Sequence, residues 1–287
     1  MNAPGTDKDR IIAFQGERGA YSHMAAESCY PDRPVLPCPG FEAALEAVAN
    51  GEAGLAMIPI ENSTAGRVAD IHLLLPGSGL FIVGEHFAPI RHNLMALPGA
   101  DEAGLTTAIS HVQALDQCRK TLRGLGLHRQ NVADTAGAAR LVAESGDTGL
   151  AAVASELAAQ EYGLTILRRN IQDEGHNTTR FVVLSRTPLD PATLTGPTMT
   201  SFTFEVRNVP AALYKALGGF ATNGVNMTKL ESYYEGDSFM ASEFYADIEG
   251  DERDSAVRRA MEELNFHTKR INVLGTYAQE RRRTLTD

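Results

Sequence analysis

The sequence has no tryptophan and only three cysteines, Cys29, Cys38 and Cys118. Three is an odd number and no two of them form a CxxC pair, so we expect neither a disulfide framework nor a cysteine-based metal site. The histidines show no HExxH-like spacing either, and we predict that the protein binds no metal. Isolated cysteines are typical of small core residues in a reducing compartment, which predicts a cytoplasmic protein.

Positive charge is also scarce, because the chain carries 26 Lys and Arg against 36 Asp and Glu, a net charge of -10. A nucleic-acid surface needs clustered basic residues, and along the sequence these occur only at residues 281–283, where we expect a solvated tail. No apolar run reaches the roughly 18 residues that cross a bilayer, and the polar N-terminal stretch does not resemble a signal peptide. We therefore expect no nucleic acid and no membrane among the partners.

The chain lacks GxGxxG and Walker motifs, so we predict that it binds no nucleotide. Its 287 residues, 43% of them hydrophobic, are enough for two domains of ordinary size. Between residues 11 and 186, expected strands ("IIAFQ", "GLAMIPI", "TTAIS", "GLAAVA") alternate with expected helices ("YSHMAAESCY", "FEAALEAVA", "QALDQCRKTLRGLG", "AGAARLVAES"). This alternation predicts a mainly parallel sheet with helices on both faces. Because the alternation restarts after "LFIVGEHFAPIRHNLMAL", we predict two α/β lobes.

A different pattern follows a proline-rich linker that contains Pro188, Pro191 and Pro197. The expected order there is strand, helix, strand, strand, helix, strand, which is the ferredoxin-like unit of the α+β class. In "SFMASEFYADIEG", Phe244, Ala246 and Ile248 alternate with Tyr245, Asp247 and Glu249, which is typical of a strand.

Polar side chains gather where expected strands end, and in an open α/β sheet this is where ligands bind. Three such groups stand out: Gly19, Tyr21 and Ser22; Glu61, Asn62 and Ser63; and Ser110, His111 and Gln117. A fourth, Thr179 with Arg180, precedes the apolar run from Phe181 to Leu184. Helix and strand caps would explain some of them. Together they suit binding of a small dianion and stabilisation of a departing oxygen. Thr179 stands at the start of its expected strand, whereas the other groups follow the ends of theirs. For Thr179 to reach the same ligand site, its strand should run antiparallel to its neighbours.

Five stretches, "FQGERGAYSHMAA", "IPIENSTAGRV", "SHVQALDQC", "DTAGAA" and "NTTRFVVL", resemble the prephenate dehydratase family in order and over nearly the whole chain. The resemblance implies conversion of prephenate to phenylpyruvate, without a cofactor, in phenylalanine biosynthesis. It also implies a two-lobed catalytic domain that is periplasmic-binding-protein-like (residues 10–187) and a C-terminal ACT regulatory domain (residues 199–279). The linker is then residues 188–198, and the tails are residues 1–9 and 280–287.

The resemblance assigns catalytic roles to Thr179, Asn62, Ser110, Gln117 and Glu61, with Thr179 as the donor to the departing hydroxyl. Arg180 is our hypothesis for a carboxylate partner, because a guanidinium can grip a carboxylate bidentately. The remaining expected substrate-binding residues are Phe181, Ser63, Tyr21, Ser22, Gly19 and His111.

The ACT resemblance predicts L-phenylalanine as the effector and a homodimer or homotetramer, with departures from the family. The usual "PGAL" is "PAAL" from Pro210 to Leu213, and the usual "ESRP" is "ESYY" from Glu231 to Tyr234. The expected effector-binding residues are Asn208, Val209, Pro210, Ala211, Ala212, Leu213, Asn226, Met227, Glu231 and Ser232.

Three alternatives stay open from the sequence. The first is an arogenate dehydratase, whose substrate carries an amino group in place of the keto oxygen of prephenate. A two-lobed α/β domain could instead be a small-anion solute-binding protein. A regulator without catalytic activity is the third alternative.

Overall fold

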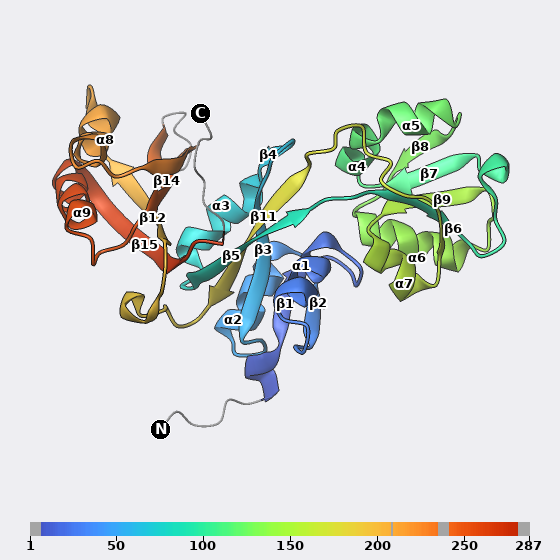
Figure 1. Cartoon of the computed structure of the whole chain (residues 1–287), viewed down its shortest axis with the longest axis horizontal. Helices are drawn as coiled ribbons and strands as arrows, with labels where there is room; N and C mark the ends of the chain where they lie inside the picture. Colours follow the sequence, from blue (N-terminus) through green and yellow to red (C-terminus); the bar gives the residue numbers. More distant parts are fainter. Residues whose placement is uncertain (1–6, 208, 235–240, 281–287) are drawn as a thin grey trace. The chain divides into compact units, whose positions relative to one another are not determined.

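The computed structural model describes residues 7–207, 209–234 and 241–280 (Figure 1). The chain divides into two compact units, Met1–Val68 with His86–Phe181 and Ala69–Glu85 with Val182–Asp287. Strands β5 (Phe81–Pro89) and β11 (Thr178–Ser185) each begin in one unit and end in the other. Short 3-10 turns connect other elements: η1 (Asp7–Arg10), η2 (Leu75–Gly77), η3 (Glu102–Gly104) and η4 (Pro191–Thr193).

The first sheet has the strand order β2-β1-β3-β11-β5, and β4 (Gly66–Arg67) pairs with β3. Its three N-terminal strands are parallel, as the strand-helix alternation predicts: β1 (Ile12–Gln15), β2 (Val35–Cys38) and β3 (Leu55–Asn62). Helices α1 (Tyr21–Cys29) and α2 (Phe41–Ala49) follow the first two of these strands. The apolar residues Ile12 and Phe14 are fully buried, so this sheet has a dry core.

The end of β3 lies beside the start of β11. The Ser63 amide donates to the Thr178 carbonyl at 2.9 Å, and the Asn62 side chain donates to Thr179 at 2.8 Å. One residue further along β11, Arg180 approaches Glu61 at 3.8 Å. Residue numbers that rise on one strand while they fall on the other indicate antiparallel strands. The direction expected for the strand of Thr179 is therefore confirmed.

The second sheet has the order β10-β6-β9-β7-β8, and its strands β7 (Thr107–Ser110), β8 (His128–Asn131) and β9 (Leu150–Ala154) are parallel, as the strand-helix alternation predicts. Strand β6 (Asn93–Ala96) runs antiparallel to both of its neighbours, β9 and β10 (Thr165–Arg168), so β6 alone is reversed and the sheet is mixed. The helix predicted at "QALDQCRKTLRGLG" is broken at Cys118 into α4 (Val112–Gln117) and α5 (Arg119–Gly124). Two further helices pack on this sheet, α6 (Thr135–Ser145) and α7 (Glu156–Tyr162).

The other unit contains a four-stranded antiparallel sheet of order β13-β14-β12-β15. Two helices pack against one face, where Phe202, Phe204, Phe220 and Leu264 form a buried cluster. The elements follow one another as β12 (Thr198–Val206), α8 (Ala212–Thr222), β13 (Met227–Tyr234), β14 (Ala241–Glu249), α9 (Ser255–His267) and β15 (Thr268–Ala278).

The opposite face of this sheet is buried as well. Tyr245 and Asp247, which alternate with the apolar residues of β14, are 1% and 0% exposed. His72 of α3 (Ala69–Leu74) stacks edge-on against Tyr245, and its Nδ1 lies 2.7 Å from the Tyr233 hydroxyl. Asp247 accepts hydrogen bonds from Tyr245 and Ser201, so the buried carboxylate is stabilised. Among the described residues, no helix is long and apolar enough to span a membrane.

Candidate active site

The side-chain amide of Asn62, at the end of β3, has its orientation fixed by the backbone. Its Oδ1 accepts from the amide N–H of Thr64 at 3.0 Å and of Ala65 at 2.8 Å, and also from the Thr64 hydroxyl at 2.8 Å. A backbone N–H can only donate, so the atom facing it must be the oxygen. The Asn62 amide nitrogen therefore points the other way and can only donate.

That nitrogen donates to the Thr179 hydroxyl oxygen at 2.8 Å and to Asn177 Oδ1 at 2.7 Å. Because the Thr179 oxygen accepts, its own hydrogen is left to donate elsewhere. In the described part of the chain the structure gives this hydrogen no acceptor. Thr179 is 7% exposed. The result is a single, fixed hydroxyl donor at the start of β11.

The hydrogen bonds continue in the same donor-to-acceptor direction around a closed ring of side chains. Asn177 Nδ2 donates to Gln117 Oε1 at 2.8 Å, and Gln117 Nε2 donates to the Thr64 hydroxyl at 3.0 Å. The Thr64 hydroxyl donates back to Asn62. Each amide in the ring is oriented by its neighbour. Asn62, the partner of Thr179, is therefore held in one position before any ligand binds.

Two further residues extend the network from Gln117. His92 Nε2 lies 2.8 Å from Gln117 Oε1, and His92 Nδ1 lies 2.7 Å from the Tyr21 hydroxyl. Burial lowers the pKa of His92, although its hydrogen bond to Gln117 opposes the shift, and burial raises the pKa of Tyr21 well above its usual range. Both side chains are therefore neutral near pH 7.

Arg180 and Glu61 occupy the other face of the sheet. Successive strand residues point to opposite faces, so Thr179 and Asn62 share one face while Arg180 and Glu61 share the other. The Arg180 guanidinium is 3.8 Å from the Glu61 carboxylate, and its side chain is 4% exposed. The structure thus brings predicted site residues together as two pairs. Thr179 and Asn62 lie on one face of the sheet, and the Arg180–Glu61 pair lies on the other.

Several other expected residues are engaged with the protein itself. The Ser110 hydroxyl is fully buried and donates to the Val153 carbonyl. Ser63 donates to the His176 carbonyl and accepts from the Thr178 amide. His111 caps α4 through the Gln113 amide, whereas Phe181 and Ser22 are buried.

Gly19 lies where the loop after β1 meets α7. Its φ is +84°, and a Cβ placed there would lie 2.5 Å from Ala158 Cα. The loop is also held by Glu17, which pairs with Arg140 at 2.6 Å and accepts from Tyr162 at 3.3 Å. The hydrogen bond from Arg140 lowers the pKa of Glu17, while burial and Glu17 raise that of Tyr162 to about 12. The glycine is required here by close backbone approach.

The sequence profile described as prephenate dehydratase matches residues 12–189. The chain belongs to the prephenate dehydratase family. It is 50% identical to a protein named bifunctional N-acyl-homoserine lactone acylase/prephenate dehydratase from Komagataeibacter europaeus, over 94% of this chain and 96% of that protein. It is 41% identical to arogenate dehydratase/prephenate dehydratase 2 from Arabidopsis thaliana, over 93% and 72%.

A solved structure of prephenate dehydratase from Arthrobacter aurescens, in complex with L-Phe, is similar to this chain with a TM-score of 0.86. The sequences are 31% identical, and the match covers 94% of this chain and 90% of that one.

Three members of the network were not singled out from the sequence: Thr64, Asn177 and His92. Thr64 and Asn177 lie inside two of the stretches that resemble the prephenate dehydratase family, "IPIENSTAGRV" and "NTTRFVVL", so the motifs contained a signal for them. His92 had none, because its partners Tyr21 and Gln117 are 71 and 25 residues away along the chain.

The residues expected to bind an effector lie in the unit that holds α8 and β13, except Asn208, which lies outside the described residues. Ala211 has φ +61° and precedes α8, at the position of the glycine in the prephenate dehydratase "PGAL" motif. Asn226 donates to Glu249 at 3.0 Å, and Glu231 pairs with Lys229 at 3.2 Å.

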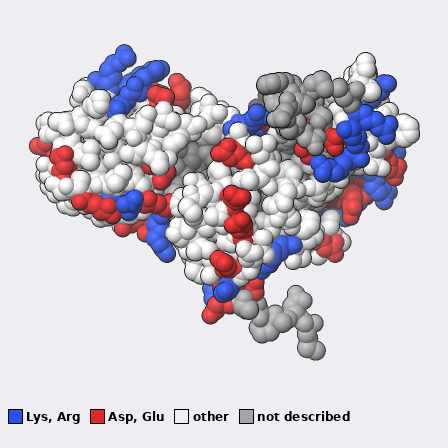
Figure 2. All heavy atoms as spheres, turned by 180° about the vertical axis from the view of Figure 1, so that it is seen from behind, with Lys and Arg blue, Asp and Glu red and all other residues white. Residues whose placement is uncertain are grey.

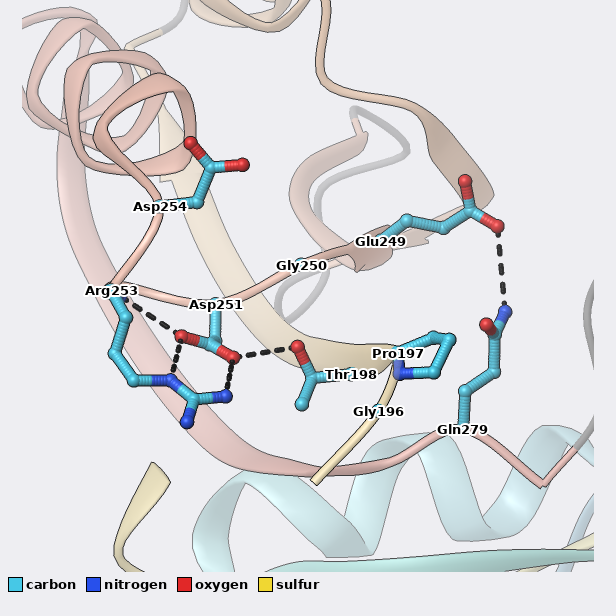
Figure 3. A pocket seen from close by; sticks show the side chains of 9 residues that line it. All are labelled: Gly196, Pro197, Thr198, Glu249, Gly250, Asp251, Arg253, Asp254 and Gln279. Carbon is cyan, nitrogen blue, oxygen red and sulfur yellow. Dashed lines mark hydrogen bonds and ion pairs between the residues drawn. The ribbon is translucent and has the colours of Figure 1, made fainter. Parts of the chain in front are cut away.

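Figure 3 shows a cavity of about 460 Å³ in the same unit. Its central carboxylate, Asp251, accepts from Arg253 Nε at 2.8 Å and from the Thr198 hydroxyl at 2.6 Å (Figure 3). These bonds, the Arg253 bond first, lower the pKa of Asp251. Across the cavity, Gln279 donates to Glu249. No group of His, Cys, Asp or Glu among the described residues is arranged to hold a metal ion.

The fold also gathers basic side chains that are spread along the sequence. Arg119, Arg123 and Arg129 line a shallow cavity of about 320 Å³ beside α5 and β8. Figure 2 shows Lys and Arg side chains gathered at the upper left of the view, over the region of α5 and β8. Arg129 pairs with Asp116 at 3.0 Å on the exposed surface. Residues 281–283 were expected to be the only basic cluster, and this cavity shows a second one. Residues 281–283 themselves lie outside the described residues.

Proposed function

We propose that this protein is a prephenate dehydratase, which converts prephenate to phenylpyruvate, carbon dioxide and water. The observation that carries the proposal is the single unpaired hydrogen of Thr179, whose oxygen is held by an amide that the backbone orients. A fixed donor aimed away from its own network is what a departing oxygen needs.

In this reaction the bond between the ring and its carboxylate breaks, and carbon dioxide leaves. The electron pair moves through the diene to the carbon that bears the hydroxyl, the C–O bond breaks, and the ring becomes aromatic. The departing oxygen takes up one proton, which solvent supplies, so a dianionic substrate and one proton give phenylpyruvate, carbon dioxide and water. Thr179 donates a hydrogen bond to that oxygen as negative charge develops on it. Its pKa is too high for full proton transfer, and aromatisation supplies the driving force.

The supporting residues then have distinct roles. Asn62 and Gln117 hold the reactive hydroxyl, with Asn177 and Thr64 between them. Arg180 and Glu61 form an ion pair on the other face of the sheet, where Arg180 neutralises a carboxylate instead of gripping a substrate next to Thr179. Ser110 supports the end of β7 through its bond to Val153.

The second part of the proposal concerns regulation. We assign residues 199–279 to a ferredoxin-like ACT domain that binds L-phenylalanine and pairs across chains in a homodimer or homotetramer. The order β12, α8, β13, β14, α9, β15 supports this assignment, as does the similarity to a prephenate dehydratase crystallised with L-Phe. The strained Ala211 and the "ESYY" sequence lie at the expected effector site, so we expect weaker binding than in relatives with "PGAL" and "ESRP".

The test is to incubate the purified chain with prephenate, with arogenate and with an N-acyl-homoserine lactone in parallel. Phenylpyruvate, phenylalanine and released fatty acid are measured, and L-phenylalanine is then titrated against the active reaction. We expect phenylpyruvate from prephenate at a higher kcat/KM than phenylalanine from arogenate. Absence of both products would refute the proposal, and acyl release alone would transfer the site to the other activity named for the Komagataeibacter europaeus protein.

A further inference from the structure

Gln117 is the point at which the hydrogen bonds of the proposed active site converge. Its Oε1 accepts from Asn177 Nδ2 at 2.8 Å, and its Nε2 donates to Thr64 at 3.0 Å. The orientation of this amide follows from the Asn62 ring, so Oε1 is an acceptor at all times. His92 Nε2, 2.8 Å from the same oxygen, must therefore carry a hydrogen.

This assignment fixes the tautomer of His92. In the neutral ring, a hydrogen on Nε2 leaves Nδ1 as an acceptor, and the Tyr21 hydroxyl 2.7 Å away is its donor. Tyr21 also lies 2.9 Å from the Arg91 carbonyl, but its one hydrogen serves His92 while the ring is neutral. The backbone amides of Thr64 and Ala65 thus set the direction of every bond out to Tyr21.

We propose that Tyr21 and His92 form a positioning pair that acts on the proposed dehydration through Gln117, and that the Tyr21 hydroxyl does not contact the substrate. The pair holds Nε2–H on Gln117, Gln117 holds Asn177, and Asn177 and Asn62 hold the Thr179 hydroxyl. The one hydrogen of the Tyr21 hydroxyl is already committed to His92, and T-shaped packing of the Tyr21 and His92 rings, at 84°, fixes both. This inference rests on the proposed function.

The first experiment compares two variants of His92. His92→Leu removes the donor to Gln117, and we expect kcat to fall on the order of 10–100-fold, as for other displacements of about 1 Å near the chemistry. His92→Gln places an amide N–H near the position of Nε2, so we expect kcat within about tenfold of the parent, by the same positional argument. KM should change less than kcat in both variants, because the pair does not touch the substrate.

The second experiment is a double-mutant cycle. Tyr21→Phe should lower kcat when His92 is present and have no further effect in the His92→Leu background, because Tyr21 acts only through His92. If Tyr21→Phe raises KM equally in both backgrounds, Tyr21 binds the substrate directly and the proposal is wrong. The proposal is equally wrong if His92→Leu keeps the parental kcat, or if His92→Gln restores nothing.

A matched control separates positioning from general destabilisation. Val142→Ala shortens a fully buried side chain of α6, away from this network, so it should lower the melting temperature without changing kcat. A readout that needs no turnover is ¹⁵N NMR of the histidine ring, in which His92 should be the Nε2–H tautomer. An Nδ1–H tautomer would overturn the inference. Failure of the unmodified chain to convert prephenate or arogenate would instead refute the proposed function.

Discussion

Asn62→Asp is the substitution that tests the direction of the hydrogen bonds most economically, because it replaces one nitrogen by oxygen and changes no shape. Oδ1 keeps the bonds from the Thr64 and Ala65 amides, now to a carboxylate. The second oxygen faces Thr179 and Asn177 and can no longer donate. The Thr179 hydroxyl must then turn its hydrogen toward residue 62, and the donor for the departing oxygen is lost.

The expected loss follows from that single donor. Removal of one preorganised donor costs about 10²–10³ in kcat, or roughly 2.7–4 kcal/mol of transition-state stabilisation. A new carboxylate also repels a dianionic substrate, which should raise KM. The control is Asn177→Asp, which adds the same charge but keeps Oδ1 as acceptor for Asn62 and loses only the bond to Gln117. We expect its kcat to fall by about tenfold, the size of one neutral hydrogen bond.

The assay is steady-state formation of phenylpyruvate from prephenate at saturating substrate, with the melting temperature measured for each variant. Equal kcat values for the two aspartate variants would show that charge, not the direction of the Asn62 amide, decides the rate. A parental kcat for Asn62→Asp would refute the reasoning about Thr179 altogether.

Three other predictions concern stability and reactivity. Ala211→Gly removes the side chain of an alanine in the left-handed region (φ +61°). Calorimetry should therefore show a free energy of unfolding that is higher by about 0.5–1 kcal/mol, and a lower one would mean that the strain is absent. The pKa of Asp251 is lowered mainly by its Arg253 bond, so its contribution to the free energy of unfolding is fully present above the unfolded pKa of about 3.9 and is lost as pH falls from there through the lower folded pKa. The stability gap between the parent and Asp251→Asn should therefore narrow steadily as pH falls below about 5, and a constant gap would contradict this. Burial raises the pKa of the Cys118 thiol, so native-state alkylation should spare it while the more exposed Cys29 reacts, as read by mass spectrometry.

Apolar periodicity predicted most elements because the lobes bury their strands on both faces. It missed β8, whose sequence "HRQN" is polar and exposed at the edge of its sheet. It also could not show the break at Cys118, because the residues on both sides continue a helical pattern. For β14, the alternation of apolar and polar residues indicates one solvent-exposed face of the strand. Tyr245 and Asp247 on that face are nevertheless buried, because residues distant in sequence pack against them.

The motifs named the two residues at the centre of the network, Asn62 and Thr179. They also grouped Thr179 with Arg180, although neighbouring strand residues point to opposite faces, and this could have been read from the strand prediction itself. What the sequence could not supply is the direction of each hydrogen bond. That depends on the backbone amides of Thr64 and Ala65, whose geometry exists only in the folded chain.

The most direct measurement of the central claim is kcat for prephenate with Thr179→Val beside Thr179→Ser. Valine keeps the shape of threonine without the hydroxyl, whereas serine keeps the hydroxyl without the methyl. The account predicts a fall of at least about 100-fold for the valine variant, the cost of a lost transition-state donor, and a fall within about tenfold for the serine variant. A valine variant that turns over prephenate at nearly the parental rate would contradict the account.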